Sequence, residues 1–117
     1  MSSTTFEIGD IVRVPFPFVE RAEVKPRPAL VVSGPLGLKQ PVLWVLMITA
    51  AANKGWPGDI SLENDHLSLG LPVPCVIRTE KISTVEVAQA RVLGRLDKGR
   101  LAQVRSRMAA ILGVAPK

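Results

Sequence analysis

Short apolar runs, broken by glycine and proline, dominate most of the chain. Residues 29–33 and 42–49 are nearly continuous runs of β-branched and apolar side chains, and a Gly-Pro-Leu-Gly sequence typical of a turn separates them. Runs of this length and composition predict buried strands. We therefore expect these two segments to be central strands that pair with each other.

The remaining strand signals are shorter or interrupted. Residues 10–18 are rich in Val and Phe, but Pro15 and Pro17 cannot donate hydrogen bonds, which places this strand at a sheet edge or at a bulge. A turn or a single helical turn is expected over residues 80–85. Further strands are expected over three ranges: 60–62, 73–79 and 87–93. About six short, closely spaced strands favour a small barrel.

The last part of the chain has the periodicity of an α-helix. Apolar residues recur there at intervals of three and four positions: Leu101, Val104, Met108 and Ile111. Asp97 stands where an N-cap residue belongs, and Gly113 and Pro116 are expected to end the helix. The opposite face carries three basic residues that we expect to be solvated rather than bound to phosphate: Arg100, Arg105 and Arg107.

Length and composition indicate one compact domain over residues 1–117. With 47% hydrophobic residues the chain can bury a core, and a monomer of this size leaves apolar surface that a second copy can cover. The net charge of +5 favours polyanions or acidic protein segments as partners. Charge alone does not choose between RNA, DNA and an acidic tail.

The single cysteine, Cys75, excludes an intramolecular disulfide and a four-cysteine zinc site. We expect a cytoplasmic protein in which this thiol is a small buried hydrophobe. No signal-peptide pattern is present, and no apolar run reaches the roughly 18 residues that span a membrane. Asp59, Glu63 and Asp65 lack the spacing of a calcium loop, so we expect a solvated loop there and neither a metal nor another cofactor.

Two prolines present one arginine at the start of a buried strand. Pro26 and Pro28 keep the backbone extended around Arg27, because a residue that precedes proline avoids the helical region. This segment and the Gly-Asp strand that begins at Gly9 resemble the start of the MazF/PemK family of toxin endoribonucleases. Later segments match the family in the same order, so that the resemblance spans roughly residues 8 to 112: 47–50, 56–60, 70–72, 76–82 and 93–96.

The resemblance implies a mainly β fold, a small SH3-like barrel of the CcdB/MazF/PemK type with a C-terminal α-helix. It also implies a metal-independent, sequence-specific endoribonuclease toxin of a type II toxin–antitoxin system. Such a toxin cleaves single-stranded RNA, such as mRNA, by attack of the 2′-hydroxyl and leaves a 2′,3′-cyclic phosphate and a 5′-hydroxyl.

The resemblance further implies three partners besides RNA. These are a second copy in a homodimer, a cognate antitoxin with an acidic segment, and operator DNA only through the antitoxin complex. RNA is expected in the groove across the dimer, with the loop 19–24 closing over it. This loop has two acidic residues and no glycine, whereas relatives often have Gly and Ser there.

Metal-free cleavage needs groups that remove the 2′-hydroxyl proton, balance the phosphorane charge and protonate the leaving oxygen. The only histidine, His66, excludes a pair of histidines and is expected to be a surface loop residue. Arg27 matches the family's Arg-Pro-Ala arginine, which implies that its guanidinium binds phosphate oxygens through paired hydrogen bonds. The alternative for Arg27 is a surface ion pair with Glu20 or Glu23.

Three further residues complete the expected catalytic set. Thr49 matches the threonine that ends the family's third strand and can donate to a phosphate oxygen, although Ala50 replaces the serine that often follows. Arg78 and Glu80 match an arginine and a carboxylate that are held to act as an acid–base pair in the PemK/Kid-like branch. We assign Glu80 to take the 2′-hydroxyl proton and Arg78 first to stabilise the phosphorane. The alternative for Glu80 is a surface ion pair with Lys81 or Arg78.

Four basic residues and one tryptophan are expected to bind RNA: Arg13, Arg21, Lys25, Trp56 and Lys81. Trp56 lies in a Gly-Trp-Pro-Gly turn, where an exposed ring can stack on a base, although packing against the barrel is the more common role of such a ring. Trp44 lies inside an apolar run and is expected in the core.

Two other classes of function remain open. Gyrase-poisoning CcdB toxins share the small-barrel fold, so a non-catalytic gyrase inhibitor is one alternative. A basic nucleic-acid-binding module that takes part in autoregulation of its own operon is the other. A supercoiling assay tests the first, and RNA binding without cleavage would indicate the second.

Overall fold

The computed structural model of the protein describes residues 5–17, 24–53 and 55–114. Its strands are β1 (Asp10–Pro17), β2 (Val24–Val31), β3 (Val42–Ala50), β4 (Ile60–Ser61), β5 (Cys75–Glu86) and β6 (Arg91–Arg95). Its helical segments are the short 3-10 turns η1 (Ala51–Asn53), η2 (His66–Leu69) and η3 (Val87–Gln89), and the C-terminal helix α1 (Lys98–Leu112).

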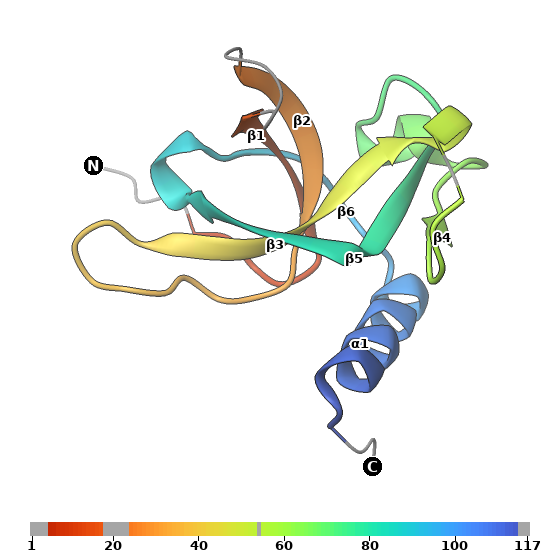
Figure 1. The fold of residues 1–117 in the computed structure, drawn as a ribbon. Helices are drawn as coiled ribbons and strands as arrows, with labels where there is room; N and C mark the ends of the chain where they lie inside the picture. Colours follow the sequence, from red (N-terminus) through yellow and green to blue (C-terminus); the bar gives the residue numbers. More distant parts are fainter. Residues whose placement is uncertain (1–4, 18–23, 54, 115–117) are drawn as a thin grey trace.

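The six strands of the described residues form one antiparallel sheet in the order β4-β5-β3-β2-β1-β6. The sheet curls into a half-barrel, and α1 lies outside it beside the bend of β5 (Figure 1). β2 pairs with β3, as predicted for the two buried runs. The expected mainly β, small-barrel fold with one C-terminal helix is confirmed.

Apolar side chains cover both faces of the sheet. The core that α1 covers, here called the helix-side core, contains Ile11, Leu30, Leu46, Ile48, Leu62, Leu69, Leu71, Cys75, Ile77, Leu96 and Val104. The core on the other face, here called the second core, contains Phe6, Val12, Val14, Ala29, Val31, Leu43, Val45 and Val85. Strands buried on both faces need apolar residues at successive positions, which explains the continuous runs in the sequence.

β1 is an interior strand over its first half and an edge over its second. β6 pairs with it only from Asp10 to Arg13, and the register shifts once within that stretch. In the described residues, Pro15 and Pro17 pair with β2 alone. The prolines therefore lie where β1 is an edge, which confirms the expectation drawn from their missing N–H groups.

The turn expected over residues 80–85 is wrong, because β5 runs without interruption through it. Between β3 and β5 the register advances two residues along β3, from Leu46 to Ile48, and five along β5, from Ile82 to Ile77. Residues 78–81 therefore bulge out of the ladder and bend the strand. The polar composition of this bulge is that of a turn, which explains the error.

Smaller expectations also need correction. β2 begins at Val24 instead of residue 29, and β6 begins only at Arg91 because residues 87–89 form η3. Trp44 is 48% exposed instead of buried, and Ile111 is 47% exposed. Trp44 lines a pocket together with Leu112, the last residue of α1, and Ile111 lies in the last turn of that helix.

The two ends of α1 agree with the sequence prediction. Asp97 Oδ2 accepts a hydrogen bond from the backbone nitrogen of Arg100 at 2.9 Å, and Gly113 ends the helix at φ 74°. Arg100 is not solvated, because its guanidinium bridges Asp97 and Asp65. The side-chain hydrogen bond from Arg100 lowers the pKa of Asp65, and the backbone hydrogen bond from Arg100 lowers the pKa of Asp97. Neither α1 nor another helix of the described residues is long and apolar enough to cross a membrane.

Two glycines allow the end of η2 and the strand β6 to meet backbone to backbone. A Cβ atom on Gly94 would lie 2.3 Å from the carbonyl oxygen of Leu69, and one on Gly70 would lie 2.3 Å from that of Leu93. Because the clashing atoms belong to the backbone, no side-chain rotation can relieve either contact. The close approach therefore requires glycine at both positions.

We expect Gly94→Ala to lower the free energy of unfolding by about 1–3 kcal/mol, because the added methyl group must push η2 away from β6. Denaturant-induced unfolding measures the change. Gly34→Ala is the matched control, since nothing lies within 4 Å of a Cβ atom there, and it should stay within about 0.5 kcal/mol of the parent. Equal losses in the two variants would contradict the close approach.

Candidate functional site

Arg27 and Thr49 lie on the neighbouring strands β2 and β3. The pairing of β2 with β3 ends at Ala29 and Met47, and Arg27 and Thr49 each lie two residues beyond this pair. Side chains two positions apart share a face of a sheet, so both residues lie on the face of the second core, which contains Ala29. Both are partly buried. The first two catalytic candidates from the sequence therefore share one face of the sheet on adjacent strands.

Thr49 is followed by η1, and the last residue of that turn reaches back to it. Asn53 Nδ2 donates a hydrogen bond to Thr49 Oγ1 at 3.2 Å. Sequence reasoning missed Asn53, because nothing in the local pattern shows that the chain turns back immediately after the strand.

Arg78 is buried, with 7% of the residue exposed. Its Nε and Nη2 atoms donate to the Asp59 carboxylate at 3.3 and 3.0 Å, and Nη2 also donates to the backbone oxygen of Asn53 at 2.6 Å. The guanidinium carbon lies 4.6 Å from the centre of the Trp56 ring, a cation–π distance. Arg78 therefore holds Asn53, Trp56 and Asp59 against β5, and Asp59 is an ion-pair partner instead of a solvated loop residue.

Glu80 lies on the exposed side of the bulge and pairs with α1. Its Oε2 atom accepts from Arg107 Nη2 at 2.5 Å, and each side chain is 35% exposed. In the described residues, no hydrogen bond or ion pair joins Glu80 to Arg78 or to Lys81. The partners of Arg78 and Glu80 come from different elements: Arg78 binds Asn53 and Asp59, and Glu80 binds α1.

The loop at residues 55–59 contacts both β5 and α1, through Thr79 and Arg107. Thr79 Oγ1 donates to the backbone oxygen of Gly58 at 2.9 Å. A Cβ atom on Gly58, whose φ is 79°, would lie 2.5 Å from Arg107 Nε and 2.7 Å from Thr79 Oγ1. Arg107 thus packs against this loop while its guanidinium holds Glu80, so it is not the solvated residue expected from the sequence.

The residues expected to bind RNA are spread over several strands. Arg13 is exposed on β1, directly opposite Arg91 of β6. Two like charges at opposed positions repel each other unless an anion lies near them. Sequence reasoning missed Arg91, because the pairing of β1 with β6 is not visible in local patterns.

The other candidates for RNA contact differ in their surroundings. Lys25 and Lys81 are exposed on β2 and in the bulge of β5. Trp56 is 44% exposed, with its ring against Arg78. Arg21, the loop segment 19–23 and the alternative partners of Arg27 lie outside the described residues.

His66 and the acidic residues of the same region have structural partners. His66 Nδ1 lies 3.0 Å from the backbone oxygen of Leu71, and Asp65 is bound by Arg100. No three His, Cys, Asp or Glu side chains of the described residues gather closely enough to hold a metal ion. Cys75 is 3% exposed, and burial raises the pKa of its thiol, as expected of a small buried hydrophobe.

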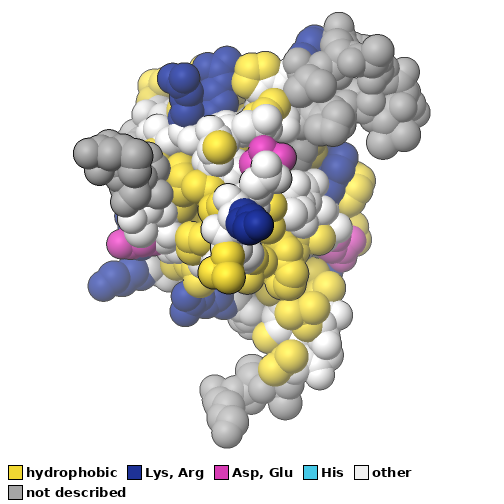
Figure 2. Space-filling model, turned by 90° about the vertical axis from the view of Figure 1, so that its left-hand side faces the viewer, with side chains coloured by type: hydrophobic (Ala, Val, Ile, Leu, Met, Phe, Trp, Pro, Cys, Tyr) yellow, Lys and Arg dark blue, Asp and Glu magenta, His cyan; other side chains and the backbone are white. Residues whose placement is uncertain are grey.

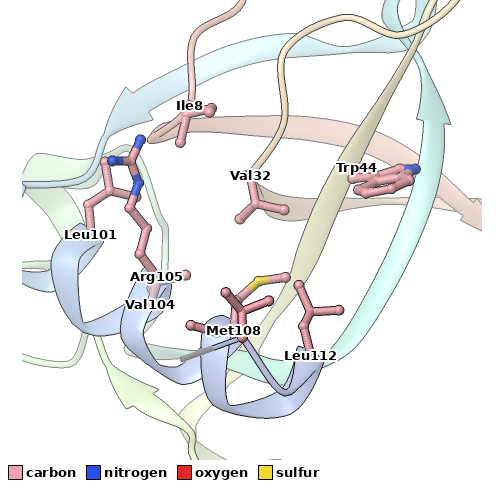
Figure 3. A pocket seen from close by; sticks show the side chains of 10 residues that line it. Ile8, Val32, Trp44, Leu101, Val104, Arg105, Met108 and Leu112 are labelled. Atoms are coloured by element: carbon pink, nitrogen blue, oxygen red, sulfur yellow. The ribbon is translucent and has the colours of Figure 1, made fainter. Parts of the chain in front are cut away.

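A pocket of about 310 Å³ lies between α1 and the edge of the helix-side core (Figure 3). Its lining includes Trp44, Met108 and Leu112, and Arg105 is its one charged residue. On the face shown in Figure 2, hydrophobic side chains run from the middle of the molecule toward its C-terminal end, with Lys and Arg side chains around them. The pocket contains none of the catalytic candidates, and its surface is suited to protein contact rather than to phosphate.

Comparisons with known proteins agree with this fold. A profile of the family described as "PemK-like, MazF-like toxin of type II toxin-antitoxin system" matches residues 7–112. A MazE-MazF structure (Form-III) from Deinococcus radiodurans is 22% identical, with a TM-score of 0.71 over 96% of this chain and 100% of that chain. MazF (Form-I) from the same organism is 21% identical, with a TM-score of 0.68 over 96% of this chain and 100% of that chain.

A more distant structure is an endoribonuclease in complex with its cognate antitoxin from mycobacterial species. It is 14% identical, with a TM-score of 0.67 over 98% of this chain and 100% of that chain. No curated protein matches the chain. At these identities the solved structures establish the fold, while the family profile extends from the start of the described strands to the end of α1. The chain therefore belongs to the PemK-like, MazF-like toxins of type II toxin–antitoxin systems.

Proposed function

We propose that the protein is a metal-independent endoribonuclease toxin that cleaves single-stranded RNA by attack of the 2′-hydroxyl on the adjacent phosphate. The observation that supports the proposal is that Arg27 and Thr49, on the neighbouring strands β2 and β3, each lie two positions from a residue of the last printed pair, Ala29 and Met47, and so share its face of the sheet. Membership of the toxin family supports it, as does the likeness in fold to an endoribonuclease. The products are an RNA with a 2′,3′-cyclic phosphate and one with a 5′-hydroxyl.

Arg27 and Thr49 act on the phosphate in this proposal. The guanidinium of Arg27 stays charged throughout and contacts the non-bridging oxygens, and the hydroxyl of Thr49 donates to one of them. Both contacts strengthen as negative charge develops on the phosphorane, which is the condition for catalysis by hydrogen-bond donors.

Glu80 is the carboxylate that we propose takes the 2′-hydroxyl proton. Arg107 holds this carboxylate from α1. The surroundings of Arg78 favour a different role from the phosphorane contact expected from the sequence, because its guanidinium is buried and bound to Asp59 and Asn53. We therefore assign the phosphate contacts to Arg27 and Thr49. We assign Arg78 the structural role of keeping Asn53 and Asp59 in place.

Basic residues outside the catalytic group bind the phosphates on either side of the cut. We propose that Lys25, Lys81, Arg21 and the opposed pair Arg13 and Arg91 take this role, and that the exposed part of Trp56 stacks on a base. The net charge of +5 favours both the RNA and an acidic antitoxin segment. The protein acts in the cytoplasm as a homodimer, and it meets operator DNA only through the antitoxin complex.

Replacing Arg27 by alanine should lower the rate of RNA cleavage by about 10² to 10³, because one preorganised donor to the phosphorane is lost. A single-turnover rate measures this effect, and circular dichroism confirms that the variant is folded. Arg105→Ala removes an exposed arginine of α1 and is the matched control with parental activity. Parental cleavage by the Arg27 variant would remove that residue from the phosphate site.

The chemistry of cleavage should be independent of metal ions and dependent on the 2′-hydroxyl. We expect full activity in EDTA, products that end in a 2′,3′-cyclic phosphate and a 5′-hydroxyl, and resistance of an RNA with 2′-O-methyl ribose at the cut. Mass spectrometry of the products identifies their ends. A 5′-phosphate that appears only with magnesium would contradict the proposed mechanism.

Glu80→Gln and Arg107→Gln form a matched pair, because each removes the same ion pair but only the first removes the carboxylate. We expect Glu80→Gln to lower the single-turnover rate by about 10² to 10⁴, the usual contribution of a general base. Arg107→Gln should stay within roughly tenfold of the parent. If the two variants have equal, small effects, Glu80 serves only to attach α1.

A further inference from the structure

Asn53 connects two residues that sequence analysis placed separately in the site. Its side-chain Nδ2 donates to Thr49 Oγ1 at 3.2 Å, and its backbone oxygen accepts from Arg78 Nη2 at 2.6 Å. One residue therefore contacts both the hydroxyl proposed to bind phosphate and the buried guanidinium of β5.

The direction of the first hydrogen bond determines what Thr49 can do. A threonine hydroxyl has one hydrogen to donate and two lone pairs that accept. Since Asn53 donates to Thr49 Oγ1, this contact occupies a lone pair and leaves the hydroxyl hydrogen for another acceptor. The non-bridging oxygens of a phosphodiester only accept hydrogen bonds, so Thr49 must donate in order to bind them.

The second contact fixes the position of Asn53. Arg78 is bound at the same time to the Asp59 carboxylate at 3.0 Å and packed on the Trp56 ring. The side chains of this ion pair are 8% and 11% exposed, and separating buried charges is unfavourable because each would lose its partner without regaining water. The backbone oxygen of Asn53 is thus attached to a part of the molecule that resists rearrangement.

We propose that Asn53 is a positioning residue that keeps the hydroxyl of Thr49 as a hydrogen-bond donor toward the scissile phosphate. The Arg78–Asp59 ion pair acts through Asn53 by holding its backbone, and Arg78 does not itself contact the RNA. The inference rests on the proposed function, since it gives Thr49 a phosphate to bind.

Two substitutions at Asn53 separate positioning from simple loss of contact. Asn53→Ala removes the donor and should lower the single-turnover rate at saturating RNA by roughly 3- to 10-fold, the effect of one neutral hydrogen bond. Asn53→Asp keeps the shape but turns the donor into an acceptor, which captures the hydroxyl hydrogen. We expect its rate to fall further than that of the alanine variant.

The control for the added negative charge is Asn64→Asp, at an exposed asparagine next to Glu63, which lines a pocket with Ala51 and Ala52 of η1. It should leave the rate at saturating RNA unchanged. The melting temperature of both Asn53 variants should match that of the parent, because the Asn53 side chain is exposed. If Asn64→Asp lowers the rate as much as Asn53→Asp does, charge rather than positioning explains the effect and the inference fails.

A double-mutant cycle with Thr49→Val tests whether Asn53 acts through the hydroxyl. Once the hydroxyl is gone, Asn53→Asp should cause no further loss of rate at saturating RNA. An equal loss with and without the hydroxyl would overturn the inference, as would parental rates in both Asn53 variants. Those outcomes leave the proposed function intact, whereas a parent protein that cleaves no RNA overturns the proposed function and this inference together.

Arg78→Lys tests the role of the ion pair. Lysine keeps the positive charge but lacks the planar guanidinium group that binds Asp59 and Asn53 at the same time. We expect a lower rate, and no additional loss when Asn53→Asp is combined with it. If Arg78→Lys keeps the parental rate, charge alone suffices at this position and the holding role is wrong.

Discussion

The bulge in β5 is the constraint on which the rest of the site depends. In a regular ladder, alternate residues would share a face, so Arg78 and Glu80 would point the same way. Within the bulge, Arg78 and Thr79 hold the loop that follows η1, whereas Glu80 binds Arg107 of α1. The bulge therefore connects β5 to this loop and to α1 through side chains, with Arg78 and Thr79 buried and Glu80 and Lys81 exposed.

Much of the architecture was predictable because it depends on local rules. Buried strands on both faces of a sheet require continuous apolar runs, and the ends of α1 require an acceptor such as Asp97 and a left-handed residue such as Gly113. The two prolines beside Arg27 restrict the backbone whatever surrounds them. These features depend only on a residue and its immediate neighbours, so local sequence patterns predict them.

The parts that could not be predicted depend on pairing between distant segments. Arg78 and Asp59 are 19 positions apart, and nothing in either segment indicates that a loop closes over the strand. The exposure of Trp44 depends on where α1 ends over the sheet, and the opposition of Arg13 and Arg91 depends on the register of β6. A polar stretch inside a bulged strand has the composition of a turn, so β5 appeared as two elements.

The pairing of β1 with β6 also sets the order in which the molecule can be completed during synthesis. Arg95 Nη1 donates to Asp10 Oδ1 at 2.7 Å, across 85 positions of the chain. Contacts so distant in sequence slow folding. β6 and α1 leave the ribosome after β1 to β5, so the sheet face beneath α1 is uncovered while the strands that carry Arg27 and Thr49 already exist. A growing chain therefore presents an apolar surface, for a limited time, to a protein that binds it before folding is complete.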